Sequence, residues 1–531
     1  MKIESVRIIN YHSIVDCEFN FPELLALVGE NNAGKSNIIY ALNLFFSKEK
    51  PRDKYSFNDP TKPIEIIVKF VDLTDNEKDK ITDDHRDGGE FTLKKVYIYY
   101  SLEDKIERDF TSIKDGKDTN TKPRGFENVL SDTLPGFYLL PAVKHCSEET
   151  KLVKTTNFGQ FLDLVFQEYN NDFQAWDNII NELKKEAEKT GTNAPLIKIA
   201  QEISTAMKEQ FSNADIKLKP AITTRADILR NLDVFVDDDC DLPIFNKGQG
   251  TQRAFIFAVL RILAKKMNER RPVFGKEKKD IIIAIEEPEL YLHPHQQKII
   301  YNLLKNLAEQ SSNQIQIIYS THSSFMVHVE EYQYVGIVKK PTLSTGTKVF
   351  QCVEEIFSTE SREEFQIMCQ FDPERNELFF AKKVVFVEGD TEKFSLPVIL
   401  DKIGKNSIQN SISIIECGSK GGIKLFLEIV NKFNESTKII DYLVMHDKDI
   451  PWKDQNDPDR AAKEKQAVAE NQGLESLCSD NPIYVFDPDF ERELELQILE
   501  KNKPYRSYKE IKDRDAVRIP STLKDFLTEN L

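Results

Sequence analysis

The sequence lacks the features of several protein classes. Its seven cysteines in 531 residues include no C-x-x-C pair, which argues against a disulfide scaffold or a cysteine-ligated zinc site and for a reducing compartment. No apolar run reaches the roughly 18 residues that a membrane helix needs. The N-terminus has an acidic residue and strand-like alternation where a signal peptide has a basic start and an apolar block. We therefore expect a cytoplasmic protein without a membrane partner.

Positive charge is also scarce. The chain has 72 Lys and Arg against 88 Asp and Glu, which gives a net charge of −16. Such a chain does not attract nucleic acid in bulk, so a nucleic-acid partner would need a local basic surface or bridging metal ions. With 40% apolar residues, the chain has enough for ordinary packed cores. The length predicts several domains, and the sequence shows no repeat of the solenoid or propeller kind.

The first part of the chain reads as an interrupted α/β unit. Strands are expected at 3–8, 14–19, 24–28, 64–70, 91–101, 281–285 and 314–320. Helices are expected at 35–46 and within 247–267. The charged stretches 71–90 and 102–125 are interpreted as loops or hairpin ends. A helical pattern at 157–215 has long charged faces and is interpreted as an insertion.

A second α/β unit is expected from about residue 380. Its four apolar strands are each followed by a helical pattern, and they lie at 384–387, 411–415, 441–445 and 483–486. This alternation predicts a parallel sheet with right-handed crossovers. Ligands of such sheets bind at the carboxyl ends of the strands. The predicted fold class of the whole chain is α/β.

A phosphate-binding loop is predicted between the strand at 24–28 and the helix at 35–46. Residues 29–36 read GENNAGKS and fit the pattern G-x-x-x-x-G-K-[ST]. The backbone N–H groups of such a loop surround a phosphate, the lysine contacts the β- and γ-phosphates, and the serine ligates Mg²⁺. The candidate nucleotide-binding residues of this loop are Gly29, Asn31, Asn32, Gly34, Lys35 and Ser36. The pattern predicts that the chain binds ATP with Mg²⁺.

Two acidic residues complete this predicted site. The buried strand at 281–285 ends in Glu286 and Glu287. Glu286 is expected to hold the metal, directly or through water, and Glu287 to orient the attacking water as general base.

The motifs GENNAGKS, GQGTQR, IIIAIEEPELYLHP and YSTHS together resemble an ATP-binding-cassette (ABC) ATPase of the chromosome-maintenance type. By resemblance, Gly248, Gln249 and Gly250 form the signature loop, which contacts the γ-phosphate bound by another subunit. His322 matches the switch histidine that senses the same phosphate. The resemblance therefore implies at least a dimer, and a tetramer if two dimers join through the insertion.

Two positions depart from that family's pattern. Glu286 stands where Asp is usual, and Asn246-Lys247 precede the signature glycines where a serine is usual. We therefore expect slow ATP hydrolysis, or ATP acting as a structural ligand and switch. The predicted organisation is an ATPase in two halves at 1–150 and 221–375, separated by a helical, dimerising insertion at 151–220.

A second cluster of acids is predicted at 380–531. Glu388 and Glu392 follow the strand at 384–387, and Asp447 and Asp449 follow the strand at 441–445. Further acids follow the other two strands, at Glu416 and at Asp487, Asp489 and Glu491. Because the carboxyl ends of parallel strands share one edge, several of these carboxylates should meet. Oxygen ligands without a Cys/His cluster favour Mg²⁺ or Mn²⁺ over zinc.

The E-G-x-x-E…D-x-D pattern resembles the Toprim domain of type II topoisomerases, primases and some nucleases. An ABC-type ATPase followed by a Toprim domain resembles the overcoming-lysogenization-defect (OLD) family of nucleases over essentially the whole chain. That resemblance implies two-metal cleavage of DNA and assigns Glu388 to acid–base chemistry or metal binding. By position, Glu491 would be a further metal ligand and Lys503 the catalytic lysine. Lys420 and Lys424 are candidate contacts to the DNA phosphates.

The leading hypothesis is thus an ATP-regulated, metal-dependent DNA endonuclease in defence against phage. One alternative is a topoisomerase-like strand-passage enzyme, which would need a tyrosine nucleophile. Another is a nucleotide-switched scaffold with an inactive Toprim site. OLD-type nucleases act alone, beside a helicase, or beside a retron's reverse transcriptase and its DNA, and the sequence does not decide among these partners.

Overall fold

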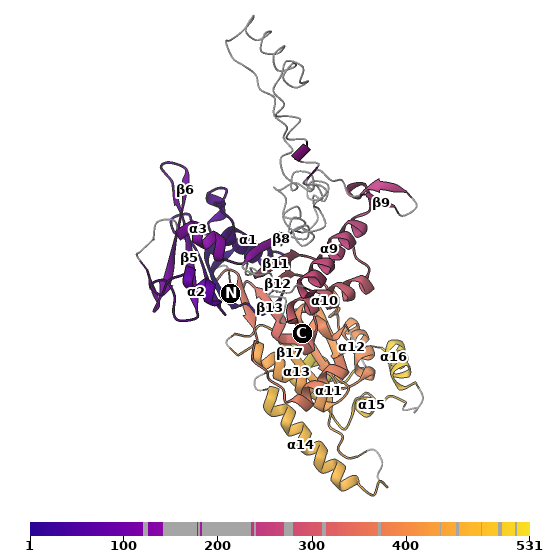
Figure 1. The fold of residues 1–531 in the computed structure, drawn as a ribbon. Helices are drawn as coiled ribbons and strands as arrows, with labels where there is room; N and C mark the ends of the chain where they lie inside the picture. Colours follow the sequence, from indigo (N-terminus) through magenta and orange to yellow (C-terminus); the bar gives the residue numbers. More distant parts are fainter. Residues whose placement is uncertain are drawn as a thin grey trace, which may run out of the picture.

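We analysed a computed structural model of the chain (Figure 1). It describes residues 1–119, 126–141, 178, 181–182, 235–237, 240–269, 280–310, 315–342, 344–369, 373–435, 437–452, 456–478, 481–497, 502–515 and 518–531, with no side-chain detail at 245 and 260–269. The helical pattern predicted at 157–215, and with it the insertion at 151–220, lies almost entirely outside the described residues. Among the helices described, none has the length and apolar character of a membrane span.

An antiparallel sheet forms one side of the ATPase part, in indigo and purple in Figure 1. Its strand order is β2-β1-β4-β5-β6-β7. The strands are β1 (Lys2–Tyr11), β2 (Ile14–Asn20), β4 (Ile64–Val71), β5 (Phe91–Tyr100), β6 (Lys105–Lys114) and β7 (Lys117–Asp118). β4 alternates buried and half-buried residues, as expected for a strand with one face on a core.

The central sheet positions the predicted nucleotide site. Its order is β14-β13-β3-β12-β11-β8, and all neighbours are parallel except β13 and β14. The strands are β3 (Leu24–Val28), β8 (Gly136–Leu140), β11 (Ile281–Glu286), β12 (Ile315–Ser320), β13 (Val335–Lys339) and β14 (Lys348–Gln351). All residues of β3, β11 and β12 are buried, which explains their continuous apolar runs. The phosphate loop, the acidic pair and the switch histidine all follow carboxyl ends of these strands and share one edge.

The C-terminal unit contains the predicted parallel sheet, in the order β16-β15-β17-β18. Its strands are β15 (Lys383–Val387), β16 (Ile412–Glu416), β17 (Asp441–Asp447) and β18 (Ile483–Phe486). The pair β9 (Phe235–Asp237) and β10 (Asp241–Pro243) forms a separate short ribbon.

Helices cover the sheets and join the two units. Those of the ATPase part are α1 (Lys35–Phe46), α2 (Asp75–Lys80), α3 (Phe126–Thr133), α9 (Gln249–Glu269), α10 (Pro294–Glu309) and α11 (Thr359–Cys369). Those of the C-terminal unit are α12 (Asp390–Lys402), α13 (Lys420–Phe433), α14 (Arg460–Cys478), α15 (Phe490–Glu493), α16 (Lys503–Asp513) and α17 (Ser521–Asn530). α14 projects away from the body of the molecule (Figure 1).

One hydrophobic core continues from the ATPase sheet into the C-terminal unit. The same cluster contains Ala26 of β3, Ile337 of β13 and Tyr442 of β17. Polar contacts follow the same boundary: the short 3₁₀-helix at Arg375–Phe379 carries Asn376, whose side chain donates to the carbonyl of Ser324 at 2.9 Å. The two units therefore pack against each other and are not separate domains joined by a linker.

Three expectations of local structure were wrong. The charged stretch at 102–125 contains strand β6, which pairs along its length with β5. The stretch at 71–90 contains helix α2, which Thr74 and Glu77 start with a capping box. The helical pattern expected after the strand at 483–486 begins with a helix of only four residues, α15. Both charged segments are largely exposed, so their sequences carry little apolar periodicity.

Candidate functional site

The phosphate loop has the backbone that its glycines predict. Gly29 has φ +144°, and a Cβ there would lie 2.2 Å from the carbonyl oxygen of Val338. Gly34 precedes α1 with φ +108°, and a Cβ there would lie 2.3 Å from the hydroxyl of Thr347. Only glycine fits either position. Asn31 and Asn32 lie exposed on the loop, and Ser36 is half-buried in the first turn of α1.

Lys35 fills its own loop. Its Nζ donates to the carbonyls of Gly29 at 2.8 Å and Glu30 at 2.9 Å. Burial lowers the pKa of Lys35 to about 8, although the nearby Glu287 and Glu289 act to raise it. A desolvated ammonium inside a loop of N–H groups fits the phosphates of a nucleotide, whose negative charge would favour the charged form of Lys35.

The acidic pair lies where it was predicted, at the end of β11. Glu286 is buried and accepts a hydrogen bond from the hydroxyl of Tyr40 on α1 at 2.7 Å. Glu287 is half-buried with φ +44°, and its N–H donates to the carbonyl of Ser320 at 2.9 Å. The contact ties the acidic turn to the end of β12, just before His322. Tyr40 was not predicted, because nothing in α1 alone indicates an acidic partner.

Glu289 is a second residue that the sequence analysis missed. It is buried, and its Oε1 accepts the backbone N–H of His322 at 2.7 Å. Its Oε2 has no hydrogen-bond partner among the described residues, and burial raises its pKa. Burial lowers the pKa of His322, and the Lys35 charge lowers it further, against the opposing effect of Glu287. Glu289 thus holds the backbone at His322 beside the acidic turn. Its signal in the sequence was the third acid of IEEPE.

The signature loop lies at the start of α9. Gly248 and Gln249 are exposed there. Gly250 is half-buried, and a Cβ would lie 3.1 Å from the carbonyl of Tyr291. An exposed loop is accessible to another copy of the chain, and its contact with that copy's γ-phosphate remains a prediction.

The acids predicted for the C-terminal unit meet at the carboxyl edge of its sheet. Glu388 follows β15, Glu392 lies in the first turn of α12, and Asp447 ends β17. Asp449 follows with φ +58°, and Glu491 lies in α15. The backbone N–H of Asp447 donates to Glu388 at 3.4 Å, and that of Phe490 donates to Asp447 at 2.8 Å. Glu392, Asp447 and Glu491 are buried.

Burial makes this cluster electrostatically unfavourable without a counter-charge. Burial, with a smaller contribution from the nearby charge of Asp447, raises the pKa of Glu392 to about 8. Burial, with a smaller contribution from the charge of Glu388, raises the pKa of Asp447 to about 7. Burial likewise raises the pKa of Glu388, although Lys420 opposes the rise.

Two lysines hold acids of the cluster. Lys503 Nζ lies 2.6 Å from Glu491 Oε1. Burial lowers the pKa of Lys503, but the hydrogen bond and charge of Glu491, with the charges of Asp447 and Glu392, raise it more, so the pKa is raised overall. Lys420 is buried and donates to Asp449 at 2.8 Å. Lys424 is exposed, and its side chain reaches α14. Its Nζ lies near Gly473 of that helix, 3.7 Å from where a Cβ would stand.

Two other acids of this edge have structural partners. Glu416 accepts from Arg375 Nη2 at 2.6 Å. Asp489 is fully buried, caps α15 by accepting the N–H of Arg492 at 2.9 Å, and binds that side chain. Both acids are thus paired with an arginine inside the fold, and Glu491 remains the predicted ligand from this segment.

Divalent cations fit the donor set of Glu388, Glu392, Asp447, Asp449 and Glu491, because hard oxygen ligands suit Mg²⁺ or Mn²⁺. In the described residues no three His, Cys, Asp or Glu side chains already stand at coordinating positions. The raised pKa values show that burial leaves these carboxylates short of positive charge, which a cation would supply.

We predict that added Mg²⁺ stabilises the chain most at alkaline pH. A carboxyl whose folded pKa is raised stabilises the fold below its unfolded pKa, about 4, and loses that contribution as pH rises through the folded pKa. For Asp447 and Glu392 the loss should extend to about pH 7 and 8. A cation at about 100 times its Kd adds about 2.7 kcal/mol.

The measurement is the unfolding temperature with EDTA and with Mg²⁺. The rise on adding Mg²⁺ should be larger at about pH 8 than at about pH 6, where more of the carboxyls are protonated. In the Asp447→Asn variant, Mg²⁺ should raise the unfolding temperature much less. In EDTA at the higher pH, the variant should unfold at a higher temperature than wild type. An equal rise in wild type and variant would contradict this prediction.

The two sites define a nucleotide-binding ATPase joined to a Toprim unit. A family model described as an AAA ATPase domain matches residues 1–123 and 94–327. A second, described as an overcoming lysogenization defect protein-like TOPRIM domain, matches residues 379–449. The chain belongs to the AAA ATPase domain family and carries an OLD-like TOPRIM domain after it.

Curated relatives align with this chain over most of their length. The chain is 25% identical to an "OLD nuclease" of Thermus scotoductus, over 99% of this chain and 98% of the relative. It is 24% identical to an "Endonuclease GajA" of Bacillus cereus, over 79% of this chain and 71% of the relative. Among solved structures, an SMC head bound to a winged-helix domain of ScpA aligns over 68% of this chain and 100% of that chain, with 15% identity and a TM-score of 0.39.

Proposed function

We propose that the chain is a nucleotide-regulated, divalent-cation-dependent DNA endonuclease that acts in defence against phage. The observation that carries the proposal is the buried carboxylate cluster at the Toprim edge, flanked by Lys420 and Lys503. The relatives named OLD nuclease and endonuclease GajA support the same activity. DNA is the expected substrate, and ATP is the expected nucleotide.

The residues of this site would have different roles in metal binding, charge stabilisation and DNA contact. Glu388, Glu392, Asp447, Asp449 and Glu491 would hold Mg²⁺ or Mn²⁺, which lowers the pKa of a bound water and stabilises the leaving oxygen. Lys503 sits beside Glu491 with a raised pKa and would remain charged to stabilise negative charge on the phosphate. Lys420 would orient Asp449, and its burial argues against the contact to a DNA phosphate expected from the sequence. The exposed Lys424 would contact the DNA backbone.

The test is cleavage of supercoiled plasmid by the full chain. Nicked or linear product should appear with Mg²⁺ or Mn²⁺ and disappear with EDTA. No cleavage under any of these conditions would favour the nucleotide-switched scaffold. DNA covalently trapped on a tyrosine would favour the strand-passage alternative.

We also infer that the ATPase works as at least a dimer. The phosphate loop and the exposed signature loop start two different helices of one chain, α1 and α9. An exposed signature loop completes a nucleotide site only when a second copy supplies it. Light scattering should give a dimeric or tetrameric mass with ATP, and a monomeric mass with and without ATP would contradict this inference. A helicase, or a reverse transcriptase with its DNA, is a candidate additional partner.

A further inference from the structure

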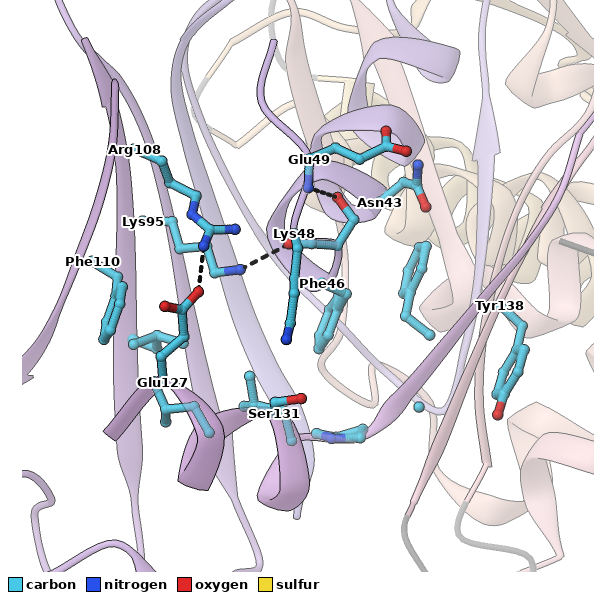
Figure 2. A pocket seen from close by; sticks show the side chains of 17 residues that line it. Asn43, Phe46, Lys48, Glu49, Lys95, Arg108, Phe110, Glu127, Ser131 and Tyr138 are labelled. Atoms are coloured by element: carbon cyan, nitrogen blue, oxygen red, sulfur yellow. Dashed lines mark hydrogen bonds and ion pairs between the residues drawn. The ribbon is translucent and has the colours of Figure 1, made fainter. Parts of the chain in front are cut away.

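A cavity of about 400 Å³ lies at the opposite end of α1 from the phosphate loop. The last turn of α1, strands β5 and β6, helix α3 and the start of β8 form its walls (Figure 2). None of the candidate residues of the nucleotide or Toprim sites lines it. Its size is that of an ordinary small-molecule site.

Positive side chains dominate the interior of this cavity. Lys48, Lys95 and Arg108 line it, and Figure 2 shows the ammonium of Lys48 pointing toward its centre. Arg108 pairs with Glu127, while the carboxylate of Glu49 points away from the centre. One carboxylate therefore faces three cations, which favours an anionic ligand in a chain whose overall charge is negative.

Lys95 has unused hydrogen-bonding capacity. Its Nζ donates to the carbonyl of Ser47 at 3.2 Å and lies 5.3 Å from the ring centre of Phe45. Capping the last turn of α1 in this way accounts for one of the three ammonium donors. Burial lowers the pKa of Lys95 to about 8, Arg108 lowers it further, and Glu127 opposes them. An anion between Lys95 and Arg108 would relieve their mutual repulsion.

The remaining wall is aromatic. Phe46 and Phe137 stack with ring centres 5.1 Å apart and an angle of 3° between their planes, and Phe110 and Tyr138 also line the cavity. A free inorganic anion would leave this apolar surface uncovered. A ligand that carries both a phosphate and a flat apolar group would contact both walls.

We propose that this cavity is a second ligand site, which binds a small organic phosphate of nucleotide size through Lys48, Lys95 and Arg108. Of the two acids that line the cavity, Glu127 pairs with Arg108 and Glu49 points away from the centre, so the site provides for binding of the ligand and not for its hydrolysis. Because Lys95 caps the last turn of α1 and Lys35 begins that helix, the bound ligand contacts both the cap and the helix that forms the phosphate loop.

The test uses the full chain with Lys35→Ala, which should no longer hold a nucleotide in the phosphate loop. Calorimetric titration with adenosine monophosphate should show one saturable site per chain. Adding Lys48→Met should weaken it at least about tenfold, the scale of one charge-assisted hydrogen bond. Lys50→Met is the matched control: Lys50 is exposed two residues away, binds the carbonyl of Ile106 and does not line the cavity.

Each arm of the titration supports or overturns the proposal. Lys95→Met should abolish binding, and Lys48→Met gives the same information from an exposed position if Lys95→Met proves unstable. Inorganic phosphate should bind at least about tenfold more weakly than adenosine monophosphate because it cannot contact the aromatic wall. Absence of binding, equal affinity for the two probes, or equal effects of Lys48→Met and Lys50→Met would each overturn the proposal.

Discussion

Asp447→Ala and Glu388→Ala should each reduce DNA cleavage at least about 10²-fold, the lower end of the range for loss of a positioned acid or base. Asp447 ends β17 inside the buried cluster, and its backbone N–H contacts Glu388. Either substitution removes one of the carboxylates expected to hold the cation, so metal affinity and cleavage should fall together. The measurement is the rate of plasmid cleavage beside wild type, with EDTA as background.

Asp441→Asn provides a matched control for these variants. Asp441 begins the same strand, at the opposite edge of the sheet, where Lys383 and Lys438 bind it. Its substitution should leave cleavage unchanged, and nucleotide binding should be unchanged in all three variants. If Asp447→Ala and Glu388→Ala cleave as fast as Asp441→Asn, the cluster is not the nuclease site.

Glu287→Gln should retain ATP binding and slow hydrolysis by roughly 10²–10⁴-fold, the usual effect of losing a general base. The amide keeps the size of the side chain, so the turn that Glu287 makes with Ser320 should persist. Calorimetry gives the affinity and phosphate release gives the turnover.

Two further variants make the result for Glu287 interpretable. Lys35→Ala should lose binding itself, because its Nζ is the cation inside the loop. Glu309→Gln, on an exposed position of α10, should change neither quantity. Hydrolysis by Glu287→Gln at the rate of Glu309→Gln would exclude Glu287 as the base.

Hydrophobic patterns in the sequence predicted the helices and strands whose buried faces carry mostly apolar residues. The apolar stripe of 35–46 gave the bounds of α1, and the continuous apolar runs gave β3, β11 and β15, because burial on both faces leaves one kind of residue. β6 was missed because most of its length pairs on one side only, with β5, while β7 pairs with just Ile113 and Lys114. Its strand character comes from its pairing with β5, not from its own composition.

The same distinction holds within the sites. Motifs placed Glu286 and Asp447 correctly at strand ends and Lys35 at the start of α1, since each motif includes its own strand or helix. Tyr40 and Glu289 were missed because their roles depend on contacts with residues distant in sequence, Glu286 and His322. The structural role of Glu416 depends on Arg375 in the same way, whereas Asp489 pairs with Arg492 only three residues away. A local pattern shows which groups are available, and the fold decides which of them meet.

The hydrophobic core that runs from β3 through β13 into β17 has a practical consequence for dissecting this enzyme. A fragment beginning near residue 380 would lack Phe365 and Phe379, whose rings contact those of Phe426 and Phe433 in the full chain. Uncovered surface of this kind promotes aggregation. Loss of activity in such a fragment would report misfolding, not a requirement for ATP. The contributions of the two sites therefore have to be separated by point substitutions in the intact chain.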